Sequence, residues 1–171
     1  MEIPRALSKP IIAAVHGYAR EGACTLAFSC DMIIATDDSD FGYPGVPNLA
    51  AAPGMHVWSL QKILGRMKAA DLIFTGEILK AKQAEEMGLV TKVVPSSKLT
   101  MATEELARKI IMMSSLAKKR TKELLYKMED LDFAAVPQEA AEALSSAFSS
   151  NDSKEARKAF LEKRKPVWTG T

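Results

Sequence analysis

The 171-residue sequence predicts an α/β fold in which a first part alternates strands with helices and a second part is helical. Between about Ile11 and Pro95, short apolar segments are separated by Gly, Pro and Asp, as in α/β proteins. After Pro95 the chain is rich in Ala, Lys and Glu and has no glycine before Gly170. We therefore expect residues 1–95 and 96–171 to form structurally different parts.

Continuous apolar runs predict buried strands in the first part. The run Pro10–His16 ends at a glycine, and Met32–Ala35 is a second apolar run. Between them, small residues from Gly22 onward favour a buried helix that reaches Cys30. Asp40–Tyr43 is expected to form a short third strand.

The rest of the first part is predicted to hold three helices and one strand. The helices are expected over Val57–Leu64, Met67–Phe74 and Lys80–Met87, with glycines at or near their ends. Leu89–Val94 alternates enough to be a strand.

Apolar residues at helical spacing predict three helices in the second part, and a capping pattern predicts a fourth. The apolar positions fall in Leu99–Met113, Leu116–Met128 and Pro137–Phe148, and the fourth helix is expected to end near Lys163. Pro137 suits the first turn of its helix. Asp152, with Glu155 three residues later, predicts the cap of the last helix. The apolar faces need covering, which a partner subunit or the first part would provide equally well.

Composition and charge exclude several classes of function. The 23 Lys and Arg against 21 Asp and Glu give a net charge of +2, too balanced for a nucleic-acid-binding surface. Two cysteines, Cys24 and Cys30, and two histidines cannot readily complete a zinc site, so no metal site is predicted and the cysteines are expected in the core. No apolar run predicts a membrane span, and no targeting signal is visible. We expect a protein of the cytoplasm or mitochondrial matrix.

Several motifs, in order and spacing, resemble the enoyl-CoA hydratase/isomerase (crotonase) superfamily. The first is the run Lys9–Ala19, followed by Gly22–Cys24 and Cys30-Asp31. Further matching segments are Phe41-Gly42, Pro53-Gly54, Leu72–Gly76, Ala81–Ala84, Gly88–Val90 and Val93–Pro95. Tyr43–Val46 and Phe160–Trp168 are most similar to the branch called enoyl-CoA hydratase domain-containing proteins.

The resemblance implies a crotonase-like spiral of stacked ββα turns over residues 1–95 and a C-terminal helical trimerisation region over 96–171. Family members carry a substantial segment before the Lys-Pro strand, whereas eight residues precede Lys9 here. The sequence therefore resembles the C-terminal two-thirds of the family domain, with an N-terminally incomplete core. The implied partners are an acyl-CoA thioester, as substrate and not cofactor, and other subunits. These would form a trimer, a dimer of trimers, or a hetero-oligomer with full-length relatives.

The chemistry implied by the resemblance is stabilisation of a thioester enolate by two backbone N–H groups. Gly22, at the start of a predicted helix, matches one donor, while the other belongs to the segment before the first strand, absent from this sequence. The two family glutamates that carry protons and hold water match Thr25 and Gly45. Neither residue transfers a proton at neutral pH.

Three explanations of the missing glutamates stay open. A relocated acid, Glu21 or Asp31, could act, although Glu21 also suits a surface turn and Asp31 a helix end or strand start. A water, a bound ion or a substrate group could replace the acid, as in relatives that carry glycine at the position of Gly45. Finally, the site could bind acyl-CoA with little or no turnover. The alternatives are thus an enoyl-CoA hydratase/isomerase-type enzyme and a catalytically silent acyl-CoA-binding or assembly subunit.

Phe160 and Lys163 match an aromatic residue and a lysine that contact CoA from the neighbouring subunit in the family. Phe offers apolar contact and Lys a charge for phosphate, but a helix-packing Phe and a solvated Lys fit the sequence equally well. His16 and His56 are interpreted as packed or hydrogen-bonded histidines, and not as catalysts. Tyr43 either points into an acyl pocket or is an ordinary strand aromatic.

Overall fold

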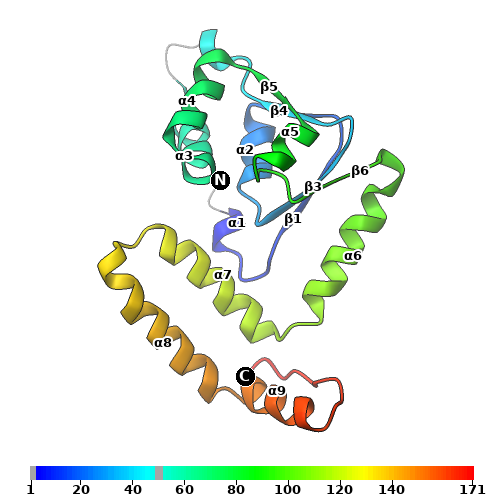
Figure 1. The fold of residues 1–171 in the computed structure, drawn as a ribbon, viewed down its shortest axis with the longest axis vertical. Helices are drawn as coiled ribbons and strands as arrows, with labels where there is room; N and C mark the ends of the chain where they lie inside the picture. Colours follow the sequence, from blue (N-terminus) through cyan, green and yellow to red (C-terminus); the bar gives the residue numbers. More distant parts are fainter. Residues whose placement is uncertain (1–2, 49–51) are drawn as a thin grey trace. The chain divides into compact units, whose positions relative to one another are not determined.

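The structure is a computed structural model that describes residues 3–48 and 52–171 (Figure 1). Contacts divide these residues into two compact units: residues 3–6 with Ile11–Ala107, and Leu7–Pro10 with Arg108–Thr171. The division falls within helix α6 (Leu99–Ile111) because its first half packs on the strands of unit 1. The boundary that the sequence suggests at residue 95 stays a prediction.

Unit 1 is built from short strands and helices. In chain order these are α1 (Ile3–Ala6), β1 (Ile12–Val15), β2 (Tyr18–Arg20), α2 (Gly22–Phe28), β3 (Met32–Thr36), β4 (Asp40–Gly42), η1 (Val46–Asn48), α3 (Gly54–Leu64), α4 (Arg66–Thr75), β5 (Ile78–Lys80), α5 (Ala81–Glu86), β6 (Lys92–Val94) and η2 (Ser96–Lys98). α6 follows and is shared between the units.

The strands of unit 1 form two three-stranded sheets. One sheet has the order β1-β3-β6 and is parallel throughout, while the other has the order β2-β4-β5, with β4 and β5 antiparallel. β1 and β2 enter different sheets, as do β3 and β4, and helices follow each of these pairs: α2 after β1 and β2, then α3 and α4 after β3 and β4. This repeat is the ββα arrangement that the resemblance implies.

Several details of unit 1 differ from the sequence prediction; for example, α2 ends at Phe28 and not at Cys30. β2 and β5, of three residues each, were not predicted because they are too short to show a pattern. α3 begins at Gly54 instead of Val57, and β6 begins at Lys92 instead of Leu89. The amides of Leu89 and Val90 both donate to the Ala84 carbonyl, which closes α5 before the strand begins.

The core of unit 1 packs α2, α3 and α4 with residues from both sheets. Phe28 of α2 stacks on the fully buried Phe41 of β4 with ring centroids 5.7 Å apart. The buried Asp40 carboxylate accepts two hydrogen bonds from Arg20 of β2, at 2.8 and 3.0 Å, and lies 3.6 Å from Lys80 of β5. The Arg20 guanidinium holds the pKa of Asp40 below its usual value, so a buried carboxylate joins the strands of the second sheet.

Unit 2 consists of helices and the C-terminal segment. After the end of α6 come α7 (Ser115–Glu129), η3 (Phe133–Ala135), α8 (Val136–Ser149) and α9 (Asn151–Leu161), with α7 and α8 running antiparallel (Figure 1). Pro137 lies in the first turn of α8, as predicted. Within residues 3–48 and 52–171, no helix is both long and apolar enough to cross a bilayer.

The predicted role of Asp152 as the cap of the last helix is wrong. Ser150 caps α9, because its hydroxyl accepts a hydrogen bond from the Ser153 amide at 3.1 Å. Asp152 is instead buried and accepts from the Ser114 hydroxyl and from the amides of Thr169 and Gly170. Burial alone would raise its pKa, but these hydrogen bonds outweigh burial and lower it. The carboxylate therefore ties the C-terminal segment to α7.

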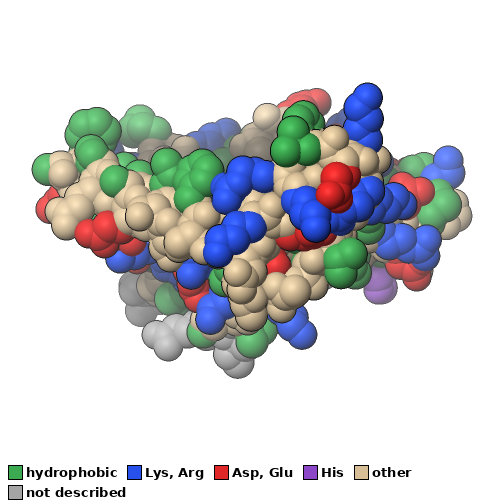
Figure 2. Space-filling model, turned by 90° about the horizontal axis from the view of Figure 1, so that it is seen from below, with side chains coloured by type: hydrophobic (Ala, Val, Ile, Leu, Met, Phe, Trp, Pro, Cys, Tyr) green, Lys and Arg blue, Asp and Glu red, His purple; other side chains and the backbone are tan. Residues whose placement is uncertain are grey.

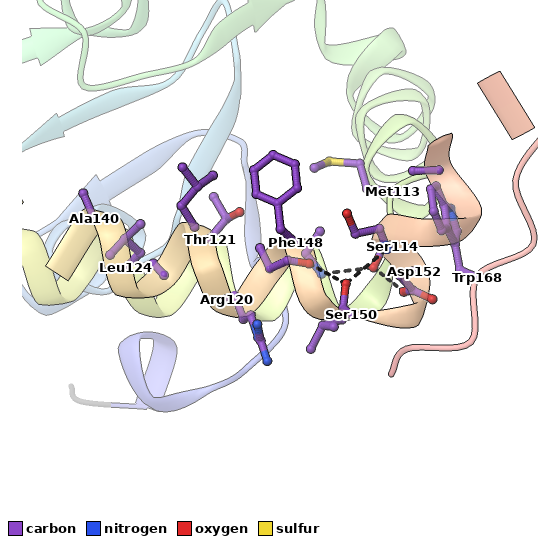
Figure 3. Close-up of a pocket in the computed structure, with 17 residues that line it drawn as sticks. Met113, Ser114, Arg120, Thr121, Leu124, Ala140, Phe148, Ser150, Asp152 and Trp168 are labelled. Carbon is purple, nitrogen blue, oxygen red and sulfur yellow. Dashed lines mark hydrogen bonds between the residues drawn. The ribbon is translucent and has the colours of Figure 1, made fainter. Parts of the chain in front are cut away.

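A groove of about 610 Å³ lies within unit 2, between α7, α8 and α9. Its lining is mostly apolar, and Figure 3 shows the side chains of Leu124, Phe148 and Trp168 along it. The Asp152 hydrogen bonds lie at one end (Figure 3). The groove contains no residue that the sequence suggests for catalysis or CoA binding.

Candidate functional site

The turn before α2 presents the candidate oxyanion donor. Gly22 is the first residue of α2, so its amide belongs to the first turn, where no carbonyl within the helix is available as partner. A Cβ at Gly22 would meet no described atom within 4 Å, which leaves open space beside the backbone. The turn is fixed from both sides, because the Glu21 amide donates to the Gly42 carbonyl and the Glu21 carbonyl accepts from the Thr25 amide.

Thr25, at the position of the first missing glutamate, is fully buried. Its hydroxyl lies 2.6 Å from Nδ1 of His56 and 3.1 Å from the Tyr43 hydroxyl. This hydrogen-bonded position inside the core leaves Thr25 as a structural link between α2, the segment after β4, and α3.

Gly45, at the position of the second missing glutamate, contacts an acid from elsewhere in the chain. The Gly45 amide donates a hydrogen bond of 2.6 Å to Oε1 of Glu21. A Cβ at Gly45 would lie only 2.9 Å from that same oxygen. The Glu21 carboxylate therefore fills the space that a side chain at Gly45 would enter. Because the Glu21 side chain is 39% exposed, the carboxylate is also accessible from outside.

His56, from the first turn of α3, completes the cluster. Its Nε2 lies 3.8 Å from Oε2 of Glu21, and its ring stacks on Tyr43 with centroids 4.4 Å apart. Burial lowers the pKa of His56 below 6.5, and this effect outweighs the opposing effect of Glu21. The imidazole is therefore neutral at pH 7. The packed, hydrogen-bonded state expected for His56 is confirmed, but no sequence spacing links it to Glu21.

The other titratable groups near Glu21 stay neutral at physiological pH. Burial raises the pKa of the Cys24 thiol to about 12 and raises that of the Tyr43 hydroxyl above its usual value of 10. Tyr43 is 1% exposed and stacks on His56, so it belongs to the core of the site. Among these neighbours, Glu21 supplies the carboxylate.

Two other sequence candidates lie outside this cluster. Asp31 accepts a hydrogen bond of 2.6 Å from the Ile11 amide and thereby joins the start of β3 to β1, which is the strand-start role expected for it. His16 is exposed, so of the two states expected for it, packed or hydrogen-bonded, the packed state is wrong. Its side chain points outward from the end of a short strand, although the sequence around it is apolar.

Phe160 and Lys163 lie at the end of α9 in unit 2, apart from the unit that contains Gly22. Phe160 is 83% exposed, so it does not pack in the core of unit 2. Lys163 takes the position after the helix cap, where its amide donates to the Phe160 carbonyl and the next amide, of Arg164, donates to Ala159. Figure 2 shows a face on which Lys and Arg side chains gather beside hydrophobic ones.

Backbone strain coincides with two of these candidates. Within residues 3–48 and 52–171, the non-glycine residues with positive φ are Glu21, at 53°, and Lys163, at 52°. Such conformations cost about 1–3 kcal/mol for a residue with a side chain, and they are concentrated at functional sites. The sequence did not predict this strain.

Comparisons with known proteins agree with this fold. The family described as enoyl-CoA hydratase/isomerase matches residues 4–171. A short-chain enoyl-CoA hydratase of Clostridium acetobutylicum is 39% identical over 160 residues, which cover 93% of this chain and 61% of that protein. Human enoyl-CoA hydratase domain-containing protein 3 is 36% identical over 162 residues, which cover 94% of this chain and 52% of that protein.

Solved structures extend the comparison to the fold. An enoyl-CoA hydratase from Bacillus anthracis superimposes with a TM-score of 0.93 at 32% identity, and covers 99% of this chain and 66% of that one. The crystal structure of human enoyl-CoA hydratase domain-containing protein 3 gives a TM-score of 0.89 at 35% identity, over 96% of this chain and 65% of that one. The chain thus spans between about half and two thirds of the length of these relatives.

Proposed function

The chain belongs to the enoyl-CoA hydratase/isomerase family, and we propose that it binds an enoyl-CoA thioester and catalyses a hydratase/isomerase-type reaction. In this proposal the reaction passes through a thioester enolate, and the Gly22 N–H donates a hydrogen bond to the enolate oxygen. The substrate is the CoA thioester itself, and no further cofactor takes part.

The observation that carries this proposal is the geometry around Gly22. An amide without a partner in its helix opens to free space, and a carboxylate lies one residue away over Gly45. A donor for the oxygen and a group able to accept a proton are the two requirements of enolate chemistry. The Gly22 amide and the Glu21 carboxylate both lie in the part of the chain that matches the family.

CoA binding is proposed to involve Phe160 and Lys163 in an oligomer. Their exposure at the end of α9 is suited to contact with CoA held by a neighbouring subunit, in which Phe160 provides apolar contact and Lys163 a positive charge for phosphate. A trimer or a dimer of trimers is the assembly proposed for this arrangement.

A catalytically silent acyl-CoA-binding subunit is the second candidate. It is favoured by the absence of carboxylates at Thr25 and Gly45, together with the burial of the Thr25 hydroxyl in the core network. In that case Gly22 would hold the thioester oxygen without any subsequent proton transfer.

Titration of the 171-residue chain with crotonyl-CoA separates the two candidates. The heat of binding and the loss of the enoyl absorbance are followed in the same sample. Binding with loss of absorbance is expected for the enzyme, and binding without that loss would identify the silent subunit. Absence of binding would contradict both.

A further inference from the structure

We propose that Glu21 is the catalytic proton carrier of this site and that His56 is its positioning residue. The inference rests on the proposed function, since it assigns the acid and base of the reaction on the CoA thioester. Thr25 and Gly45 have no acidic group, so the proposal assigns both proton transfers of the reaction to Glu21.

The first support is that the Glu21 carboxylate occupies the space beside Gly45. Glu21 Oε1 accepts from the Gly45 amide at 2.6 Å and lies 2.9 Å from the point where a Cβ of residue 45 would be. A carboxylate carried by residue 45 would have to enter this same space. The site therefore retains a carboxylate at this place although the residue that carries it is different.

The second support is the way the carboxylate is held. One oxygen is fixed by the Gly45 amide, while the other faces His56 Nε2 at 3.8 Å. His56 is itself fixed by Thr25, at 2.6 Å from Nδ1, and by stacking on Tyr43. Two segments distant in sequence from Glu21, at Gly45 and at His56, thus converge on its side chain, which an ordinary surface turn does not require.

The third support is the backbone of Glu21. Its φ of 53° and ψ of −123° belong to a conformation that glycine adopts readily and glutamate does not. An acid at this position carries a conformational cost that glycine would avoid. The same turn directs the side chain over Gly45, beside the Gly22 amide. Strain retained together with a convergent set of contacts points to a role for the side chain.

The chemistry balances with this single carboxylate. Glu21 takes a proton from water as the water oxygen bonds to C3 of the 2-enoyl thioester. The double-bond electrons move onto the thioester oxygen, which the Gly22 N–H stabilises. Protonated Glu21 then returns its proton to C2, the enolate collapses to the thioester, and one water has been added. Neutral His56 leaves the carboxylate free to act as a base, whereas a protonated His56 would hold it as an ion pair.

The test compares Glu21→Gln with the matched control Glu105→Gln, an exposed glutamate of α6. Crotonyl-CoA hydration and the Kd for the same thioester are measured for both variants and for the unmodified chain. Glutamine still accepts the Gly45 hydrogen bond, so we expect Kd to stay within about 3-fold while turnover falls by about 100-fold or more. The control should match the unmodified chain in both measurements.

Each other outcome has a definite meaning. Turnover of Glu21→Gln within 3-fold of the unmodified chain would overturn the role of Glu21. Binding without any turnover by the unmodified chain would also overturn it, while acyl-CoA binding would stand. Absence of binding by the unmodified chain would instead contradict the proposed function.

The positioning role of His56 is tested by the pH–rate profile of His56→Gln. The titratable groups that interact with Glu21 among the described residues are Cys24, Tyr43 and His56, and the first two remain neutral up to high pH. We therefore expect the acidic limb of the profile to move to lower pH when His56 no longer titrates. If the acidic limb of the His56→Gln profile stays at the same pH and only the rate falls, His56 has a structural role and no positioning role.

Discussion

Glu21 and Lys163 both have a positive φ, but the Glu21 side chain accepts a backbone hydrogen bond whereas the Lys163 side chain is exposed. Glu21 accepts a hydrogen bond of 2.6 Å from the Gly45 amide, which holds its carboxylate although the side chain is partly exposed. This contact counteracts part of the roughly 1–3 kcal/mol that the backbone conformation costs. Lys163 is exposed, and its backbone conformation alone should dominate the effect of a substitution.

Replacement of Lys163 by glycine should therefore stabilise the chain. Glycine adopts the left-handed conformation after a helix cap without strain, so we expect the free energy of unfolding to rise by about 1 kcal/mol. Urea denaturation followed by circular dichroism measures the change. The same variant should bind crotonyl-CoA more weakly if Lys163 contacts phosphate. Lower stability of Lys163→Gly would show that its side chain makes a favourable contact within the folded chain.

His56 predicts how stability depends on pH. Its pKa in the folded chain lies below the value of 6.5 for a free histidine, so the unfolded chain binds more protons once the pH falls below about 6.5. Stability should consequently fall between pH 7 and pH 5, by at most about 1.4 kcal/mol per pH unit. The lowered pKa values of Asp40 and Glu155 act at lower pH, because carboxylates titrate below about pH 4.

Denaturation of the parent chain and of His56→Gln at pH 7, 6 and 5 measures this contribution. The loss of stability with falling pH should be smaller in the variant, which has no imidazole to protonate. An identical pH dependence in both proteins would contradict the assignment to His56.

At the scale of elements, two glycines with positive φ allow the steric cost of a side chain to be separated from its conformational cost. Gly76 ends α4 with φ of 65°, and Gly88 follows α5 with φ of 78°. A Cβ at Gly76 would lie 2.9 Å from Pro47 Cγ, whereas a Cβ at Gly88 would meet no described atom within 4 Å. Only the first position combines positive φ with a collision.

Alanine at Gly76 should accordingly destabilise the chain more than alanine at Gly88. We expect a loss of about 1 kcal/mol for Gly88→Ala from conformation alone, and about 2–4 kcal/mol for Gly76→Ala, where the Pro47 contact adds an overpacking cost. Thermal and chemical denaturation of the two variants give the comparison. Equal losses would indicate that Pro47 moves aside without cost.

The longer helices could be predicted from the sequence, whereas α1, the strands β2 and β5, and the place of His56 in the site could not. α6 to α9 show several turns of apolar periodicity, which is a strong local signal. β2 and β5 have three residues each and exist through pairing with β4, a contact distant in sequence. Glu21 could be identified as a candidate acid because it is a carboxylate next to Gly22 in the sequence. His56 could not, because its neighbourhood forms only when α3 folds onto the segment after β4.

For the whole molecule, the proposed site draws on more than one subunit. Glu21 and Lys163 belong to different units of the chain, and the proposal assigns Lys163 to CoA held by a neighbouring subunit. Two variants, each defective at one of these residues, should then complement each other in a mixed oligomer.

Co-refolding of Glu21→Gln with Lys163→Ala in equal amounts tests this arrangement. Random assembly leaves about one site in four with both functional residues, so activity should reappear to about that extent. Each variant refolded alone is the control. A mixture no more active than the average of the two controls would contradict a shared site.

The central claim is that Glu21 supplies the carboxylate that residue 45 lacks, and exchange of the two residues tests it most directly. Crotonyl-CoA hydration is measured for Glu21→Gly, for Gly45→Glu and for the double variant that carries both changes. The account predicts that Glu21→Gly loses activity by about 100-fold or more and that Gly45→Glu in the same chain restores most of it. It predicts no gain from Gly45→Glu alone, because Glu21 already fills that space. Full activity in Glu21→Gly, or a double variant as inactive as Glu21→Gly although it still binds the thioester, would contradict the claim.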